Sequence, residues 1–135
     1  MTDQIIRKSI HLRASQQQVW AFLTDPDKLS QWFHKPQAPL KAGEPYQVIK
    51  KDSEERLMWG NVLRADPFTR LTYEFSIHIM AETVSIVDWT LTPVDGGVML
   101  SLEHTGLPAG AEGYGLVLAL DEGWDKHLGT LRGLT

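Results

Sequence analysis

The sequence predicts an α+β domain in which a curved antiparallel sheet of about six strands, joined as a meander, is covered by a long C-terminal helix. Three observations lead to this fold class. Strand-type alternation recurs through the middle of the chain, an Asp-Gly pair marks a hairpin at residues 94–97, and helix-type apolar spacing marks residues 114–134. Because strands and helices are segregated along the chain, the sheet is expected to be antiparallel.

Composition limits the function classes. The chain has 135 residues, 42% of them hydrophobic and 22% charged, which predicts one globular domain over residues 1–135. The net charge of −4 and the scattered basic residues predict no nucleic-acid partner. No apolar run approaches the roughly 20 residues that a membrane helix needs, so we expect no membrane partner and a cytoplasmic location. Without cysteines or paired histidine spacing, no metal or other cofactor is expected.

The N-terminal region predicts one strand followed by two short helices. Residues 5–13 alternate as a strand with one buried face. Ser15 is typical of a helix N-cap. Asp25 and Pro26 end this helix, because proline disfavours helical geometry in the residue before it, and they also suit the cap and first position of a second helix.

Aromatic residues are concentrated in residues 16–33, on both sides of that break. Val19, Trp20 and Leu23 are expected to pack the first helix against the sheet as ordinary core. Trp32 follows the break, where the chain changes direction, and need not share their face. We expect Trp32 at the end of the groove between the helix and the sheet.

The middle of the chain predicts a loop and five strands. Residues 34–44 contain two prolines and a glycine, which indicates an exposed loop that could cover a pocket as a lid. Ile79-Met80, at an expected hairpin tip, is predicted to be an exposed apolar spot. The predicted strands are residues 46–49, 57–65, 70–77, 84–93 and 98–105.

The Asp-Gly turn predicts a register as well as a hairpin. If Val94 lies opposite Gly97, the inward pairs follow from the alternation of side chains. Tyr73 and Phe75 of the preceding strand should share this face, which is therefore aromatic with one histidine. The facing pairs are Leu91 and Leu100, Trp89 and Leu102, and Val87 and His104.

The predicted C-terminal helix is interrupted by glycines, each of which costs about 1 kcal/mol relative to alanine in a helix interior. Close approach or spare room on the packed side would explain them, and so would drift at tolerant positions. They are Gly115, Gly123, Gly129 and Gly133.

This order of elements, with certain residues at certain places, resembles the START-like helix-grip superfamily (SRPBCC, Bet v 1-like). It is most similar to the family named after the C-terminal domain of the activator of Hsp90 ATPase. The likeness covers nearly the whole chain and is specific for the fold, whereas the superfamily's activities differ widely. The matching residues are Ile10, Ala14, Val19-Trp20, Leu23-Thr24-Asp25-Pro26, Leu29, Trp32, Gly60, Val62, Asp66-Pro67, Leu91-Thr92-Pro93, Gly97, Leu102, His104, Gly106-Leu107-Pro108, Gly123-Trp124, Leu128 and Leu131.

The leading hypothesis is a pocket protein, monomeric or homodimeric, that binds a small hydrophobic or aromatic molecule between the C-terminal helix and the sheet. The same aromatic side chains could instead simply fill the core. The expected ligand-binding residues are Trp32, Phe33, Tyr73, Phe75, Trp89, His104 and Trp124.

Two other classes remain open. A cyclase or dehydratase would use His104 or Tyr73 as an acid or base, but no inward carboxylate pair supports catalysis, and a histidine satisfied by its neighbours is the alternative interpretation of His104. An interaction module with a role in stress response could contact a chaperone ATPase, with Ile79-Met80 as the candidate surface. The eukaryotic co-chaperone carries an N-terminal domain to which nothing in these residues corresponds, so its activity is not carried over.

Overall fold

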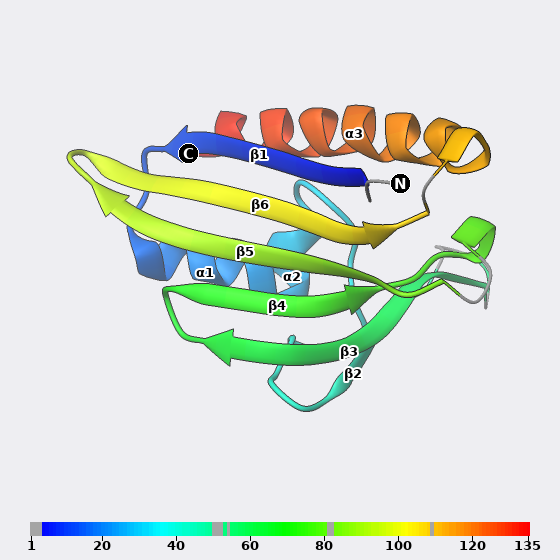
Figure 1. Ribbon diagram of the computed structural model, residues 1–135. Helices are drawn as coiled ribbons and strands as arrows, with labels where there is room; N and C mark the ends of the chain where they lie inside the picture. The colour runs from blue at the N-terminus through cyan, green and yellow to red at the C-terminus, as the bar shows by residue number, and fades with distance from the viewer. Residues whose placement is uncertain (1–3, 50–52, 54, 81–82, 109) are drawn as a thin grey trace.

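The computed structural model describes residues 4–49, 53, 55–80, 83–108 and 110–135. One six-stranded sheet runs in the order β1-β6-β5-β4-β3-β2, and three helices lie on one of its faces (Figure 1). The predicted α+β class, with two short helices between the first two strands, is confirmed. The elements are β1 Gln4–Leu12, α1 Gln16–Thr24, α2 Pro26–Leu29, β2 Pro45–Ile49, β3 Arg56–Asp66, β4 Arg70–Phe75, a 3-10 helix His78–Met80, β5 Ser85–Val94, β6 Gly97–Leu107 and α3 Gly110–Gly133.

The β5–β6 hairpin has the predicted register. Val94 lies opposite Gly97, and the pairing continues through Trp89 with Leu102 to Val87 with His104. All of these pairs are antiparallel neighbours, so the turn at residues 94–97 determines which side chains face the helices.

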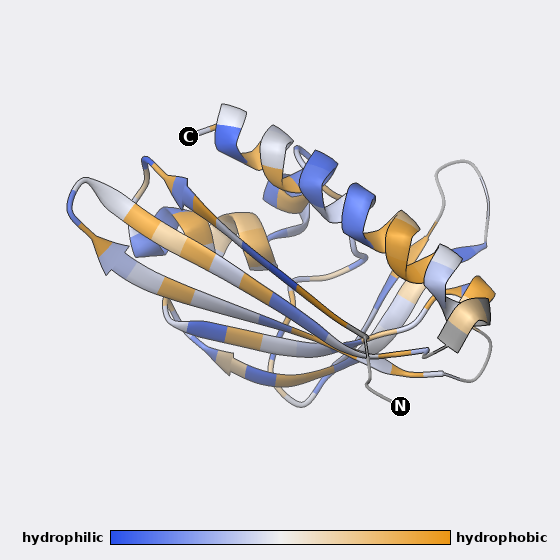
Figure 2. Cartoon of the chain, turned by 45° about the horizontal axis from the view of Figure 1, so that its top comes forward, coloured by the Kyte–Doolittle hydropathy of each residue, from blue (hydrophilic) through white to orange (hydrophobic). Residues whose placement is uncertain are grey.

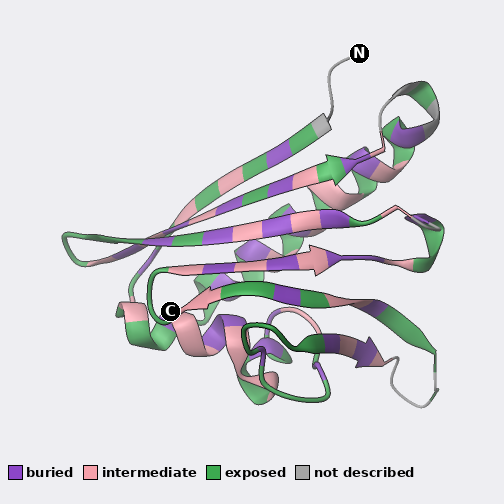
Figure 3. Cartoon of the chain, turned by 60° about the horizontal axis from the view of Figure 1, so that its bottom comes forward, coloured by how far each residue is buried: buried purple, intermediate pink, exposed green. Residues whose placement is uncertain are grey.

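Burial alternates along the central strands, as expected for a sheet with one covered face. Leu71, Tyr73 and Phe75 of β4 are buried, whereas Thr72 and Glu74 between them are only half-buried. The same alternation is visible in hydropathy (Figure 2) and in burial (Figure 3). The core therefore lies between the inner face of the sheet and the three helices.

The two short helices begin where the sequence predicts. Ser15 and Gln18 form a capping box, in which each side chain accepts a hydrogen bond from the backbone N–H of the other residue, at 3.1 and 2.8 Å. Asp25 ends α1 and caps α2, and Pro26 is the first residue of α2. A single residue thus sets the break between the helices.

The long helix α3 covers the sheet beside β1. It begins at Gly110, earlier than the predicted residue 114, and its residues Trp124, Leu128 and Leu131 are buried. Lys8, which interrupts the apolar parity of β1, forms ion pairs with two aspartates of α3. Among the described residues, no helix combines the length and the apolar character needed to cross a membrane.

The structure reverses the predicted roles of two tryptophans. Trp20, expected in the core, is half-buried at the edge of α1, where its ring meets Phe68. Trp32, expected at the mouth of the groove, is only 4% exposed, and its Nε1 donates to the carbonyl of Phe22 at 2.8 Å. The chain folds back after α2, so the later aromatic residue enters the core.

The loop and the expected hairpin tip also differ from the prediction. In the loop, Pro36 and Leu40 are buried, and the backbone N–H of Leu40 donates to the carbonyl of Thr24 at 3.1 Å. The loop is therefore attached to the core and is not a free lid. Near the tip, Ile79 is 74% exposed as predicted, but Met80 is buried, and residues 81–82 lie outside the described residues.

Candidate functional site

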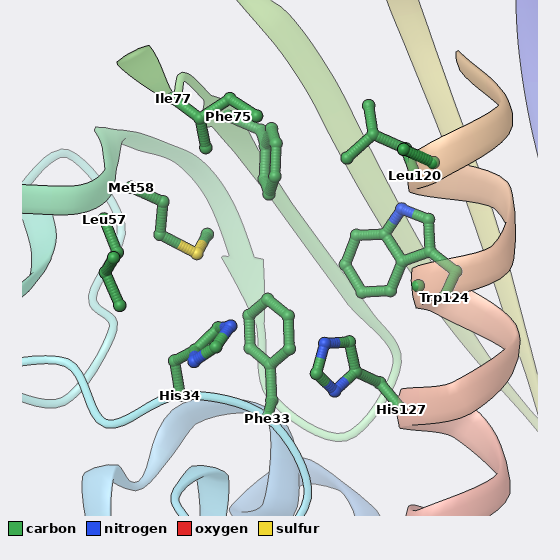
Figure 4. A pocket seen from close by; sticks show the side chains of 11 residues that line it. Phe33, His34, Leu57, Met58, Phe75, Ile77, Leu120, Trp124 and His127 are labelled. Atoms are coloured by element: carbon green, nitrogen blue, oxygen red, sulfur yellow. The ribbon is translucent and has the colours of Figure 1, made fainter. Parts of the chain in front are cut away.

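A pocket of about 140 Å³ lies between α3 and the inner face of the sheet, beside the segment that follows α2. Its surroundings are mainly apolar and aromatic, with histidines on one side (Figure 4). The lining residues are Phe33, His34, Leu57, Met58, Phe75, Ile77, Ala119, Leu120, Gly123, Trp124 and His127.

Three of the predicted site residues line this pocket. The ring of Phe33 stacks on that of Trp124, with centroids 5.4 Å apart and planes at 16°. Phe75, from β4, approaches Trp124 with its centroid at 6.2 Å. Offset stacking of this kind stabilises aromatic pairs beyond simple burial. These side chains come from three separate segments, so the pocket exists only in the folded chain.

A glycine of α3 leaves space at the pocket. A Cβ atom built on Gly123, which lines the pocket, would meet no heavy atom within 4 Å. The same holds for Gly115, Gly129 and Gly133, so close approach does not explain any of the four helix glycines. Of the two structural explanations, spare room on the packed side applies to Gly123, because a side chain at this position would extend into the pocket.

His104 lies behind Trp124 and does not line the pocket. Its Nδ1 accepts a hydrogen bond from Trp124 Nε1 at 3.1 Å, which leaves the ring proton on Nε2. That Nε2 donates to Ser85 Oγ at 2.8 Å, and Ser85 Oγ donates to the carbonyl of Phe75 at 2.7 Å. Burial lowers the pKa of His104 to about 4, so the ring is neutral at pH 7. Its two nitrogens are both satisfied within the core.

The remaining predicted residues form the layer beneath the pocket. Trp32 and Trp89 pack edge to face with centroids 6.0 Å apart, and Trp89 Nε1 donates to the hydroxyl of Tyr73 at 3.1 Å. Burial raises the pKa of Tyr73, which keeps the hydroxyl neutral. None of these three residues lines the pocket of about 140 Å³. The ring of Trp89 packs edge to face against that of Trp124, with centroids 5.5 Å apart.

Two histidines at the pocket were not predicted as site residues. The rings of His34 and His127 lie 5.4 Å apart, and His127 Nδ1 bonds to the carbonyl of Trp32 at 3.0 Å. Burial lowers the pKa of both histidines. Repulsion from His127 lowers the pKa of His34 further, and repulsion from Lys126 has a lowering effect on the pKa of His127. The spacing could have indicated His127, because it follows Trp124 by three residues and shares its helix face.

Among the described residues that line the pocket, none is a lysine, arginine, aspartate or glutamate. In the part of the chain that the structure describes, no group of three or more histidine, aspartate or glutamate side chains is placed to hold a metal ion. The site therefore offers apolar surface, aromatic faces and imidazole nitrogens as its chemistry.

A comparison with known protein families identifies the family of this chain. The model of the family described as "Activator of Hsp90 ATPase homolog 1-like protein" matches residues 13–135, which is most of the chain. The chain belongs to this family. No curated protein matches it in sequence.

Solved structures share the fold of this Hsp90-activator-like family. A protein from Mesorhizobium loti superposes with a TM-score of 0.84 at 20% identity, covering 97% of this chain and 96% of that one. An HSP90 activator from Plasmodium falciparum gives 0.81 at 16% identity, covering 96% and 94%. The Aha1 dimer from Colwellia psychrerythraea gives 0.79 at 15% identity, covering 96% and 93%. At these identities the likeness establishes the fold alone.

Proposed function

We propose that this protein binds a small apolar or aromatic molecule in the pocket between α3 and the sheet. The observation that carries the proposal is the pocket itself: about 140 Å³, walled by Phe33, Phe75 and Trp124, at a position where Gly123 leaves room. An apolar cavity of about 150 Å³ engineered into another protein stays dry and binds benzene. A single aromatic ring therefore matches the available volume.

The pocket is below the roughly 300–1,000 Å³ that is usual for drug-sized ligands. This favours one ring with few substituents over a long lipid or a polycyclic molecule. Phe33 and Trp124 stack directly on each other in the pocket wall and present aromatic surface against which such a ring can pack.

The test uses the glycine that faces the pocket. Benzene and toluene should raise the Tm of the wild-type protein, because a ligand that binds only the native state stabilises it. The Gly123→Leu substitution places a side chain in the pocket and should abolish the shift. Gly129→Leu, on the exposed side of the same helix, is the matched control and should retain it. A Tm shift unchanged in Gly123→Leu would show that the ligand binds elsewhere.

A second proposal follows from the family and from one exposed residue. Ile79 is 74% exposed beside the buried Met80, so it could contact a chaperone ATPase. The test is ATP turnover by Hsp90 in the presence of wild-type protein or Ile79→Ser. An effect of the wild type that the substitution removes would support it, and no effect of either protein would dismiss it.

Catalysis by His104 is not supported in the same way. The cyclase or dehydratase hypothesis needs His104 to open into a cavity, whereas both of its ring nitrogens are bonded to Ser85 and Trp124. The cytoplasmic location, the role in stress response and the choice between monomer and homodimer stay predictions.

A further inference from the structure

The pocket has a polar end. Figure 4 shows His34 and His127 on either side of Phe33, away from Phe75 and Ile77. The ring centroids of the two histidines lie 4.7 and 4.9 Å from that of Phe33. A ligand ring in the pocket would therefore have apolar groups at one end and imidazoles at the other.

The hydrogen bond to Trp32 determines the tautomer of His127. The carbonyl oxygen of Trp32 can only accept, so Nδ1 of His127 must carry the proton and donate across the 3.0 Å contact. In the uncharged ring, Nε2 then holds a lone pair. Figure 4 shows a ring nitrogen of His127 directed toward the pocket, and no described residue donates a hydrogen bond to Nε2.

The surroundings keep this end of the pocket uncharged at pH 7. Burial lowers the pKa of His127; the hydrogen bond to the Trp32 carbonyl opposes this in part, and the neighbouring Lys126 on α3 adds a smaller lowering effect. Burial also lowers the pKa of His34, from the segment after α2, and repulsion from His127 adds to it. The pocket therefore presents an unpaired acceptor and not a cation.

We propose that the preferred ligand is a small phenol, a single aromatic ring with a hydroxyl group that donates to Nε2 of His127. Its ring would lie against Phe33 and Trp124, with its apolar edge toward Phe75. This inference rests on the proposed function and specifies the ligand class for the same pocket.

An aromatic carboxylate fits these groups less well. Its charge would enter an apolar site where no lysine or arginine stands among the described lining residues, and a buried anion without a partner is strongly disfavoured. An unsubstituted ring would fit in volume but would leave Nε2 of His127 without a donor. A single ring with one hydroxyl group fits the pocket volume and also supplies a donor for Nε2 of His127.

The experiment measures Kd by calorimetry for phenol, toluene and benzoate, with wild-type protein, His127→Leu and His11→Leu. His11 is exposed on the opposite parity of β1 from the core, so its substitution is the matched control. Because toluene and phenol have nearly the same shape, the ratio of their Kd values isolates the hydroxyl. Loss of one hydrogen bond should shift that ratio against phenol by about tenfold in His127→Leu and leave it unchanged in His11→Leu.

A second readout needs no substitution, in case His127→Leu disturbs Trp32 and the fold. The ¹⁵N resonance of His127 Nε2 should move when phenol is added to the wild type and stay in place with toluene.

The outcomes separate this inference from the proposed function. Toluene and phenol binding with the same ratio in all three proteins would overturn the hydroxyl assignment and leave the pocket proposal standing. Benzoate binding more tightly than phenol would also overturn it. If none of the rings bound to the wild type, both proposals would be wrong.

Discussion

Nε1 of Trp124 donates a hydrogen bond to Nδ1 of His104 at 3.1 Å, so an imidazole outside the pocket orients the largest side chain of the pocket wall. Ser85 completes the arrangement by accepting from the other ring nitrogen. His104 therefore acts as a positioning residue within the core.

The first prediction concerns acid stability. The ordinary histidine pKa is 6.5, whereas His104 in the folded protein has a pKa of about 4, because burial disfavours its charge. Between these values the unfolded chain binds more protons, so the contribution of His104 is complete above pH 6.5 and is lost as pH falls to 4. The loss should be on the order of 3 kcal/mol, measured by urea unfolding at pH 7 and pH 4.5.

The control is the double variant His34→Leu/His127→Leu, which keeps His104 and should keep most of the pH dependence. An NMR titration that gave His104 a pKa near 6.5 would contradict the assignment.

The second prediction compares two tryptophans. Trp32→Ala removes a buried ring and leaves the Phe22 carbonyl without its donor, so unfolding free energy should fall by about 3–5 kcal/mol. Trp20→Ala removes a half-buried ring and should lower it by about 1–2 kcal/mol. Chemical denaturation of both variants checks the order, and equal losses would contradict it.

The third prediction uses two glycines of α3. Gly129→Ala should raise the unfolding free energy by about 1 kcal/mol, because alanine favours the helix and the site is open. Gly113→Ala should lower it, since the added Cβ would clash with the carbonyl oxygen of Pro108. Thermal unfolding of the pair tests this, and a stabilised Gly113→Ala would show that the start of α3 can shift.

The fourth prediction concerns the ion pairs between β1 and α3. Lys8 Nζ lies 2.8 Å from Asp121 and 2.9 Å from Asp125, and its side chain is only 18% exposed. Removing both carboxylates, as Asp121→Asn/Asp125→Asn, leaves a poorly solvated ammonium and should lower unfolding free energy by about 1–3 kcal/mol.

Lys8→Met is the matched variant, because it removes the charge and keeps an apolar stem on the inner parity of β1. It should stay within about 1 kcal/mol of the wild type. Urea unfolding of both variants measures the change in unfolding free energy. A loss of more than about 1 kcal/mol in Lys8→Met would show that the ion pairs themselves stabilise the fold.

Much of the fold could be predicted because its signals are local. The register from Val94 to His104 follows from turn chemistry and from the alternation of side chains, which need no knowledge of distant residues. The break between α1 and α2 follows in the same way from Asp25 and Pro26.

The pocket was less predictable because four segments that are distant in the sequence build it. Aromatic residues on the inner parity could belong to the wall, as Phe33 does, or to the layer beneath, as Trp89 does, and parity does not distinguish the two. The roles of Trp20 and Trp32 depended on how the chain folds back after α2. His34 lies in the loop, where no periodicity indicates its direction.

The pairing of β1 with β6 sets an order of events during synthesis. β1 precedes the other five strands of the sheet in the chain, yet within the described structure it pairs with β6, residues 97–107, and its other neighbour is α3. Synthesis proceeds at roughly 5–20 residues per second, so β6 is made on the order of 5–20 s after β1. During this time the apolar side chains of β1 have no strand partner; they are Ile6, Ile10 and Leu12. The nascent domain therefore carries β1 without its strand partner until β6 has been synthesised, and the β1 edge of the sheet forms only after that.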